Sequence, residues 1–372
     1  MVKNEKTSEN VKKLDQKKLI ILIAAIVVFA GVVVYLFIQQ GGFYGGVGML
    51  DGDELDFETG SKYMYSIVDG GVAAVSTTGI QCYDRAGNVT INEKRRLSEP
   101  EVYACEKYAV AYERGGSQVI GFSQGSINYE ITAKNDIISA TVNKKGWTAV
   151  CTPESGYKGV VTVYDASGTA AFEWYSGEGY LLQAVVSPDS KKLAVITVGE
   201  AGGRIVFLSF SSEETLSSNV FDGEIVLEAK FTSNNEILVV SETAVFSMNT
   251  DGEQTWSFEF NNKYLSNYSI GSDDYTALVL NDYQVGNKYS IITIDRKGTV
   301  IKSEVFEQGI FSVSSAGKYL AILHTGGLTV LDKELNTLNK VYDTNAAEQV
   351  FMRPNGVAII TDQHSAKAIG IS

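Results

Sequence analysis

The segment Leu193-Ala194-Val195-Ile196 is one of eight short apolar stretches that recur along the chain at intervals of 36 to 46 residues. A repeat of about 40 residues gives room for four short strands and their turns, which is the size of a propeller blade. The sequence therefore predicts an all-β fold, a β-propeller of four-stranded blades. The other seven copies of the apolar stretch are residues 72–75, 108–111, 147–150, 237–240, 275–278, 319–322 and 357–360.

A polar turn follows the next alternating strand in most repeats, with an Asp or Asn and then a glycine three residues later. Tyr83-Asp84-Arg85-Ala86-Gly87 is one copy, and others have Asp165, Asn249 and Asp295 in the same place. Such a segment forms a type I turn, in which the Asp or Asn side chain accepts hydrogen bonds from turn amides and glycine takes a positive φ. We expect these turns to join the third and fourth strands of a blade, with a structural rather than a chemical role for the aspartates. A looser copy begins at Asp332.

The number of blades follows from the number of repeats, although two repeats are irregular. Eight copies predict eight blades; seven is the alternative, because the second and fourth units lack a clean turn motif. The last unit leaves room for one more strand, at residues 366–371, but not for two. We expect residues 54–59 to supply the missing outer strand, because pairing the two ends closes the ring and removes an exposed sheet edge.

An uncharged run of twenty residues begins at Leu19 and ends at Ile38. At about 1.5 Å per residue, a helix of this length spans the roughly 30 Å hydrocarbon core of a bilayer. The preceding tail has six lysines and three acidic residues, so the positive-inside rule places it in the cytoplasm. A cleaved signal peptide is the alternative, but its apolar region is shorter, about 7 to 15 residues, and ends at small residues. The sequence predicts an uncleaved, single-pass signal anchor in the cell membrane.

Four segments result from this division of the chain. They are a cytoplasmic basic tail over residues 1–18, the transmembrane anchor over 19–38, a stalk over 39–52 and an extracytoplasmic propeller over 53–372. The stalk is rich in glycine and has little tendency to form a helix or a strand.

The charge balance of the exported part is strongly acidic. Without the tail, the chain has 25 basic and 41 acidic side chains. Such a surface repels phosphate backbones and anionic lipid headgroups. Nucleic acid is therefore not an expected partner, whereas a protein, a peptide or a glycan at the cell envelope is.

The three cysteines are an odd number, so a disulfide framework cannot use them all. Cys82 and Cys151 lie in apolar, strand-like segments and are expected to be buried thiols. A bridge between Cys82 and Cys105, on neighbouring blades, is the open alternative. Two histidines, His324 and His364, are too few for a histidine-rich metal centre.

Catalytic and cofactor-binding motifs are missing from the sequence. It has no Gly-x-Ser-x-Gly elbow, no His-Glu-x-x-His zinc helix and no Gly-x-x-x-x-Gly-Lys phosphate loop. The acidic cluster at residues 51–56 lacks the ligand spacing of a calcium loop. We therefore expect no catalytic, cofactor-binding or metal-binding residues, and the chain is not expected to be an enzyme.

The longest irregular connections follow the second strand of a repeat, at residues 113–117, 154–158, 199–204 and 281–287. Loops carry binding residues more often than the strands that hold them. Tyrosine and arginine are enriched among residues that contribute most to interfaces. The predicted partner-binding residues are Arg114, Tyr157, Lys158, Arg204 and Tyr283.

Residues 246–256, which include Asn249, Gly252 and Trp256, resemble the repeat of quinoprotein-like and WD40-like propellers. Quinone-dependent dehydrogenases have a tryptophan after the turn in most blades; here only Trp256 stands there and Trp174 approximates it, so no cofactor is implied. With its basic tail and single anchor, the chain resembles the uncharacterised bacterial membrane proteins grouped as domain-of-unknown-function family 5711. That resemblance implies an extracytoplasmic propeller without an established activity.

Three functions are consistent with the sequence. A non-catalytic binding or assembly scaffold at the envelope is favoured, since the chain combines a tethered rigid fold with no catalytic motif. The first alternative is an envelope hydrolase or lyase whose carboxylates, from separate blades, meet near the propeller axis. The second is a sensor of an external ligand, for which the tail of 18 residues provides no recognisable signalling domain.

Overall fold

The computed structural model describes residues 54–371, apart from 58–60, 213, 273, 284–287, 343 and 345–346. These residues belong to one compact unit, residues 46–372. The predicted tail, anchor and stalk lie outside the described residues. Within the described part of the chain, no helix is long and apolar enough to span a membrane.

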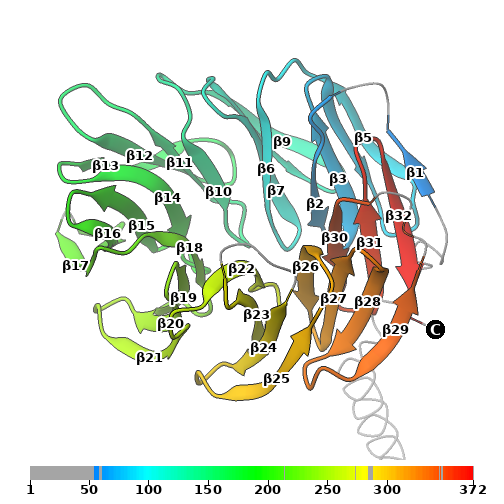
Figure 1. Ribbon diagram of the computed structural model, residues 1–372. Coiled ribbons are helices and arrows are strands. Elements are labelled where there is room, and N and C mark those ends of the chain that lie inside the picture. Colours follow the sequence, from blue (N-terminus) through cyan, green and yellow to red (C-terminus); the bar gives the residue numbers. More distant parts are fainter. Residues whose placement is uncertain are drawn as a thin grey trace, which may run out of the picture. The chain divides into compact units, whose positions relative to one another are not determined.

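The described strands form eight antiparallel sheets of four strands each, which follow one another around a ring (Figure 1). The predicted all-β propeller with eight blades is confirmed. Blades 1 to 4 are β2 (Met64–Val68), β3 (Gly71–Ser76), β4 (Gly79–Tyr83), β5 (Val89–Lys94); β6 (Pro100–Cys105), β7 (Tyr108–Glu113), β8 (Gln118–Ser123), β9 (Ser126–Thr132); β10 (Ser139–Val142), β11 (Thr148–Thr152), β12 (Gly159–Tyr164), β13 (Ala170–Ser176); and β14 (Tyr180–Val186), β15 (Lys192–Gly199), β16 (Gly202–Ser209), β17 (Thr215–Asp222).

Blades 5 to 8 complete the ring, and the last of them combines both ends of the described chain. Their strands are β18 (Val226–Phe231), β19 (Glu236–Ser241), β20 (Ala244–Asn249), β21 (Gln254–Glu259); β22 (Tyr264–Ser269), β23 (Tyr275–Asn281), β24 (Tyr289–Asp295), β25 (Val300–Phe306); β26 (Ile310–Ala316), β27 (Tyr319–His324), β28 (Gly327–Asp332), β29 (Thr337–Val341); and β30 (Gln349–Met352), β31 (Val357–Thr361), β32 (Ser365–Gly370), β1 (Glu54–Asp56).

Strand β1 closes the ring, as the sequence predicts. It pairs with β32 in antiparallel register, with Leu55 opposite Ala366, and becomes the outer strand of blade 8. Leu55 is buried in a cluster with Tyr65 of blade 1 and Ile359 of blade 8. The described strand ends at Asp56, three residues earlier than expected.

The eight recurring apolar stretches are the second strands of the eight blades. Eight hydrophobic clusters lie among the described residues, one between each pair of neighbouring blades. Strand β15 shows why the stretches are continuously apolar. Ala194 and Ile196 pack toward blade 5, whereas Leu193 and Val195 pack toward blade 3. Both faces of such a strand are buried, so no polar residue alternates with the apolar ones.

The turn motif joins third and fourth strands, as expected. In the β4–β5 turn, Asp84 Oδ1 accepts hydrogen bonds from the amides of Ala86 (2.8 Å) and Asn88 (2.9 Å), and Gly87 has a φ of 82°. The Asn88 side chain and these turn amides hold the pKa of Asp84 below its ordinary value. In the looser copy, Leu335 takes the glycine position with a φ of 63°.

Blades 2 and 4, which lack the turn motif, are complete. Strands β8 and β9 are joined by Gln124 and Gly125 alone, and residues 210–214 join β16 to β17. Because any connection that reverses the chain can join two antiparallel strands, an irregular turn does not remove a blade. The alternative of seven blades is wrong.

The cysteines of the described chain form no disulfide. Cys82 and Cys151 are buried, as expected, and Cys105 is half-buried. Burial raises the pKa of both Cys82 and Cys151 to about 12, so these two thiols stay protonated and unreactive.

The strand order defines two rims and an inner ring. The first strands of neighbouring blades contact one another around the ring, and we call these eight strands the inner ring. Consecutive antiparallel strands alternate in direction. Connections from second to third strands, and links from each blade to the next, therefore share one rim, which we call the link rim. The remaining turns form the opposite rim.

Replacing Leu55 with alanine should destabilise the whole propeller, because the substitution removes buried surface from the one strand that closes the ring. A buried Leu→Ala change costs about 2 to 5 kcal/mol of unfolding free energy. Urea unfolding of the full chain followed by tryptophan fluorescence measures the loss. The exposed neighbour Glu54→Ala is the control, and equal midpoints for the two variants would contradict closure by β1.

Candidate partner-binding rim

Four of the five predicted partner-binding residues lie in connections between second and third strands, and Arg204 lies near the start of the third strand β16, so all five are at the link rim. Arg114 belongs to blade 2, Tyr157 and Lys158 to blade 3, Arg204 to blade 4 and Tyr283 to blade 6. The fold brings those of blades 3 and 4 together and leaves Arg114 and Tyr283 on other blades.

Three tyrosines and a lysine form a continuous surface where blade 3 meets blade 4. The exposed ring of Tyr157 packs on Tyr175, with ring centroids 4.9 Å apart. Lys158 Nζ lies 4.7 Å from the ring centroid of Tyr180 and 3.4 Å from its hydroxyl. We call Tyr157, Lys158, Tyr175 and Tyr180 the tyrosine patch. A hydrogen bond from the Lys158 amide to the Ser176 carbonyl (2.8 Å) fixes the loop against the strand that carries Tyr175.

Arg204 borders the tyrosine patch but is engaged within the chain. Its guanidinium forms an ion pair with Glu178, in the link between blades 3 and 4. Glu178 remains mostly exposed, whereas Arg204 is more covered. The pair holds the link in place beside Tyr180, so we assign Arg204 a positioning role at this surface.

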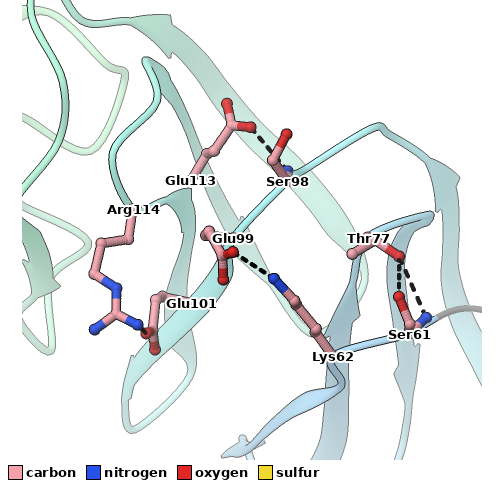
Figure 2. A network of polar contacts seen from close by, with 8 residues as sticks. All are labelled: Ser61, Lys62, Thr77, Ser98, Glu99, Glu101, Glu113 and Arg114. Carbon is pink, nitrogen blue, oxygen red and sulfur yellow. Dashed lines mark hydrogen bonds and ion pairs between the residues drawn. The ribbon is translucent and has the colours of Figure 1, made fainter.

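Arg114 belongs to a charged network on blades 1 and 2 (Figure 2). Arg114 Nη2 lies 3.3 Å from Glu101 Oε1, and Lys62 reaches across from the β1–β2 link to pair with Glu99. Glu113 accepts a hydrogen bond from the Ser98 amide (2.8 Å). Solvent screens exposed ion pairs of this kind, so they add little to stability; Lys62, Glu99 and Arg114 keep more than half of their side-chain surface exposed.

Tyr283 is exposed on blade 6, two blades away from the tyrosine patch in ring order. Its amide donates a hydrogen bond to Asn281 Oδ1 (3.2 Å). Asp282 pairs with Lys263 at 2.9 Å. The remainder of this loop, residues 284–287, lies outside the described residues.

A pocket of about 370 Å³ lies at the seam where blades 8 and 1 meet. It is lined by the β1–β2 link, by β2, by the start of β30 and by the β31–β32 loop. Tyr65 is buried, and its hydroxyl has no hydrogen-bond partner. Burial, and then the nearby Asp362 carboxylate, raise the pKa of Tyr65. The Tyr65 hydroxyl therefore stays protonated. The sequence shows no sign of this pocket, because its walls come from both ends of the chain.

The carboxylate of Asp362 in this pocket has a structural role. It accepts hydrogen bonds from the amides of His364 and Ser365 (both 2.7 Å) and from the Ser365 hydroxyl (2.9 Å). Burial acts to raise the pKa of Asp362, but these hydrogen bonds outweigh it and lower the pKa. A general acid needs a raised pKa, so Asp362 does not supply one.

A second pocket, of about 510 Å³, lies between blades 6 and 7 and contains His324. His324 Nδ1 accepts a hydrogen bond from the Gly326 amide (3.0 Å). Its Nε2 therefore carries the proton and donates to Thr329 Oγ1 (2.9 Å). Burial, and then Lys340, lower the pKa of His324, which keeps the ring neutral and makes it a structural group.

One carboxyl group of the inner ring lies in an unusual environment. Glu228, on β18, accepts a hydrogen bond from the Tyr268 hydroxyl of β22. Burial, and then the charge of Glu228, raise the pKa of Tyr103 on β6. Strand β6 belongs to blade 2, three blades away from the blade of Glu228. Burial raises the pKa of Glu228, although Tyr268 and Lys230 oppose the shift.

The inner-ring strands of the described chain contain two acidic residues, Glu101 and Glu228. Glu101 pairs with Arg114, and Glu228 accepts from Tyr268. The two carboxyl groups therefore bond to different partners and do not form the acid and base pair that a glycosidase mechanism needs. Nor does any group of three His, Cys, Asp or Glu side chains in the described part of the chain have the arrangement of a metal site.

Comparison with protein families gives a match over most of the chain. A family of unknown function, DUF5711, matches residues 52–368. The chain belongs to this family. No curated protein matches it.

Three solved structures similar to this DUF5711 chain have low sequence identity to it. The C-terminal WD40 domain of Sif2 has a TM-score of 0.61 and 14% identity, covering 88% of this chain and all of its own. The Cps50 (Swd1) propeller domain of Myceliophteria thermophila gives 0.51 and 11%, over 75% and 99% of the two chains. A eukaryotic initiation factor gives 0.56 and 12%, over 85% and 87%. At this identity the likeness shows the fold alone.

Glu228→Gln should change how the stability of this DUF5711 chain depends on pH. The folded-state pKa of Glu228 is raised, so folding favours its protonated form, and the wild type loses stability as the pH rises through that value. Glutamine keeps an oxygen for Tyr268 but cannot ionise. Urea midpoints at pH 4 and pH 8 should therefore show a larger advantage of the variant over the wild type at pH 8.

Glu200→Gln, on an exposed loop, is the control for this measurement. A stability difference between Glu228→Gln and the wild type that is the same at both pH values would contradict the burial assigned to Glu228.

Proposed function

We propose that the chain is a membrane-anchored, non-catalytic binding scaffold that holds a partner polypeptide on its link rim, outside the cytoplasmic membrane. The tyrosine patch carries this proposal. Tyr157, Tyr175 and Tyr180 are all exposed on one face, and together they form an amphipathic surface of the kind that dominates binding energy at protein interfaces.

The hydrogen bonds of the aspartates and of His324 support a scaffold without catalysis. The turn aspartates cap turns, Asp362 caps a loop, and His324 is neutral with both ring nitrogens engaged. Each of these groups therefore has a structural partner in the fold. The propeller then acts as a rigid support on which loops present recognition residues.

The sequence supports a location of the propeller on the extracytoplasmic side of the membrane. The uncharged run from Leu19 to Ile38 has the length of a membrane span, and the lysines before it favour a cytoplasmic N-terminus. An acidic propeller tethered in this way would stay soluble beside anionic headgroups and leave its rim open to envelope proteins.

Replacing Tyr157, Tyr175 and Tyr180 together with serine should abolish partner binding. Interface tyrosines of this kind typically contribute about 2 kcal/mol or more each, so recovery of the partner should fall at least about tenfold. In-cell crosslinking of the tagged full-length protein, followed by mass spectrometry, measures this. Tyr342→Ser, at an exposed tyrosine of blade 7, is the control. Equal recovery from both variants would contradict a role for the tyrosine patch.

Labelling with a membrane-impermeant maleimide tests the predicted orientation. In a Cys105→Ser background, Ser233→Cys in the propeller should react in intact cells, because Ser233 is exposed. Ser8→Cys in the tail should react only after lysis. The opposite pattern would place the propeller in the cytoplasm and overturn this part of the proposal.

A further inference from the structure

Four consecutive blades have a bulge at the same place in their inner-ring strand. In blades 4 to 7, the pairing of the first strand with the second skips one residue, and that residue is Leu182, Leu227, Ser266 and Phe311 in turn. The first strands of blades 8, 1, 2 and 3 pair with their second strands without interruption. A bulge changes the direction in which side chains point, and it is a regular feature of strands rather than a defect.

The residue after each bulge is polar and bonds to the next blade. Gln183 Oε1 accepts from the Ala229 amide (3.3 Å), Asn267 Nδ2 donates to the Phe311 carbonyl (3.5 Å), and Ser312 Oγ accepts from the Val350 amide (3.1 Å). Glu228 accepts from Tyr268 in the same way. The bulge therefore lets one polar residue join neighbouring blades while the residue before it is left exposed.

Three of the four bulged residues are apolar side chains in contact with water. Leu182 is 36% exposed, Leu227 44% and Phe311 55%. Ile225 and Tyr264, at the link-rim ends of the same inner-ring strands, are exposed as well. We call these five residues the apolar crescent. It continues the tyrosine patch, since Tyr180 begins the strand that carries Leu182. Neighbouring exposed apolar residues of this kind mark interaction sites.

The link rim around the apolar crescent is acidic. The link-rim connections and strand ends of blades 4 to 7 contain the basic residues Arg204, Lys263, Lys288 and Lys340, and the first two are paired with Glu178 and Asp282. The acidic residues on the same connections and strand ends are Glu178, Glu200, Asp222, Glu224, Glu242, Glu259, Asp282 and Glu307. A surface with this charge favours a cationic partner and repels anionic lipids and nucleic acids.

We propose that the apolar crescent, with its acidic surround, binds a basic amphipathic polypeptide segment of a partner protein. Apolar side chains of the segment cover Leu182, Leu227 and Phe311, and its lysines or arginines face the rim carboxylates. The inference deepens the proposed function and rests on it, because it names the chemistry of the partner. The bulges confine the site to one half of the ring.

Fluorescence anisotropy with a defined probe tests the proposal. The probe is a short labelled peptide of leucine and lysine in an amphipathic pattern, added to the full chain in phosphatidylcholine nanodiscs, with empty nanodiscs measured alongside. The variant Leu182→Ser/Leu227→Ser/Phe311→Ser should bind the probe at least about tenfold more weakly than the wild type. A leucine and glutamate peptide of the same pattern should not bind, and binding of the lysine peptide should weaken with salt.

The matched control is Leu216→Ser/Val220→Ser/Val305→Ser, which removes equally exposed apolar residues from the outer strands β17 and β25. It should bind the probe within about twofold of the wild type, because only the apolar crescent is expected to contact the peptide. Equal binding by the crescent and control variants, or binding of the glutamate peptide, would overturn the inference. If the tyrosine variant loses its cellular partner while the crescent variant keeps full probe affinity, the proposed function stands and this inference fails.

Discussion

No β-sheet continues from one blade of this propeller to the next, so side-chain contacts carry most of the links between the inner-ring strands, and the form of the link rim follows from that constraint. Each sheet is hydrogen-bonded within its own four strands, so the free backbone edge of each inner-ring strand needs partners outside that sheet. Thr141 donates to the Ala184 carbonyl, Ser269 pairs with Ser315, and Ser312 accepts from Val350. The apolar clusters between blades then pack around these polar contacts.

The same constraint accounts for the difference between the two halves of the ring. In blades 4 to 7, a bulge places a polar residue where it can reach the next blade, and the preceding residue is left exposed. On blades 1 and 2, the link rim carries the charged network of Lys62, Glu99, Glu101 and Arg114 instead. One half of the link rim is therefore apolar with an acidic surround, and the other half is balanced in charge.

The sequence predicts the repeated parts of the fold well, because periodicity reports burial on both faces of a strand. The second strands, the Asp84-type turns and the closing strand β1 all follow from spacing and turn chemistry. The bulges could not be predicted in this way. A single extra residue such as Leu227 changes no apolar period, and it becomes visible only when β18 is paired with β19.

The candidate site was predicted in part, and the limits are physical. Tyr157 and Lys158 could be predicted because they lie in a long loop. Their partners could not: Tyr175 is brought beside Tyr157 by the register of strand β13, and Tyr180 belongs to the next blade. From the sequence alone, Arg204 was predicted to be free to bind a partner, because its ion-pair partner Glu178 lies 26 residues away.

The most direct test of the proposed binding surface is photocrosslinking in living cells from p-benzoylphenylalanine placed at Phe311 or at Val305. A partner segment bound at the apolar crescent should give a discrete polypeptide adduct from position 311 and none from position 305; an adduct from 305 alone, or the same adduct from both, would contradict binding at the crescent.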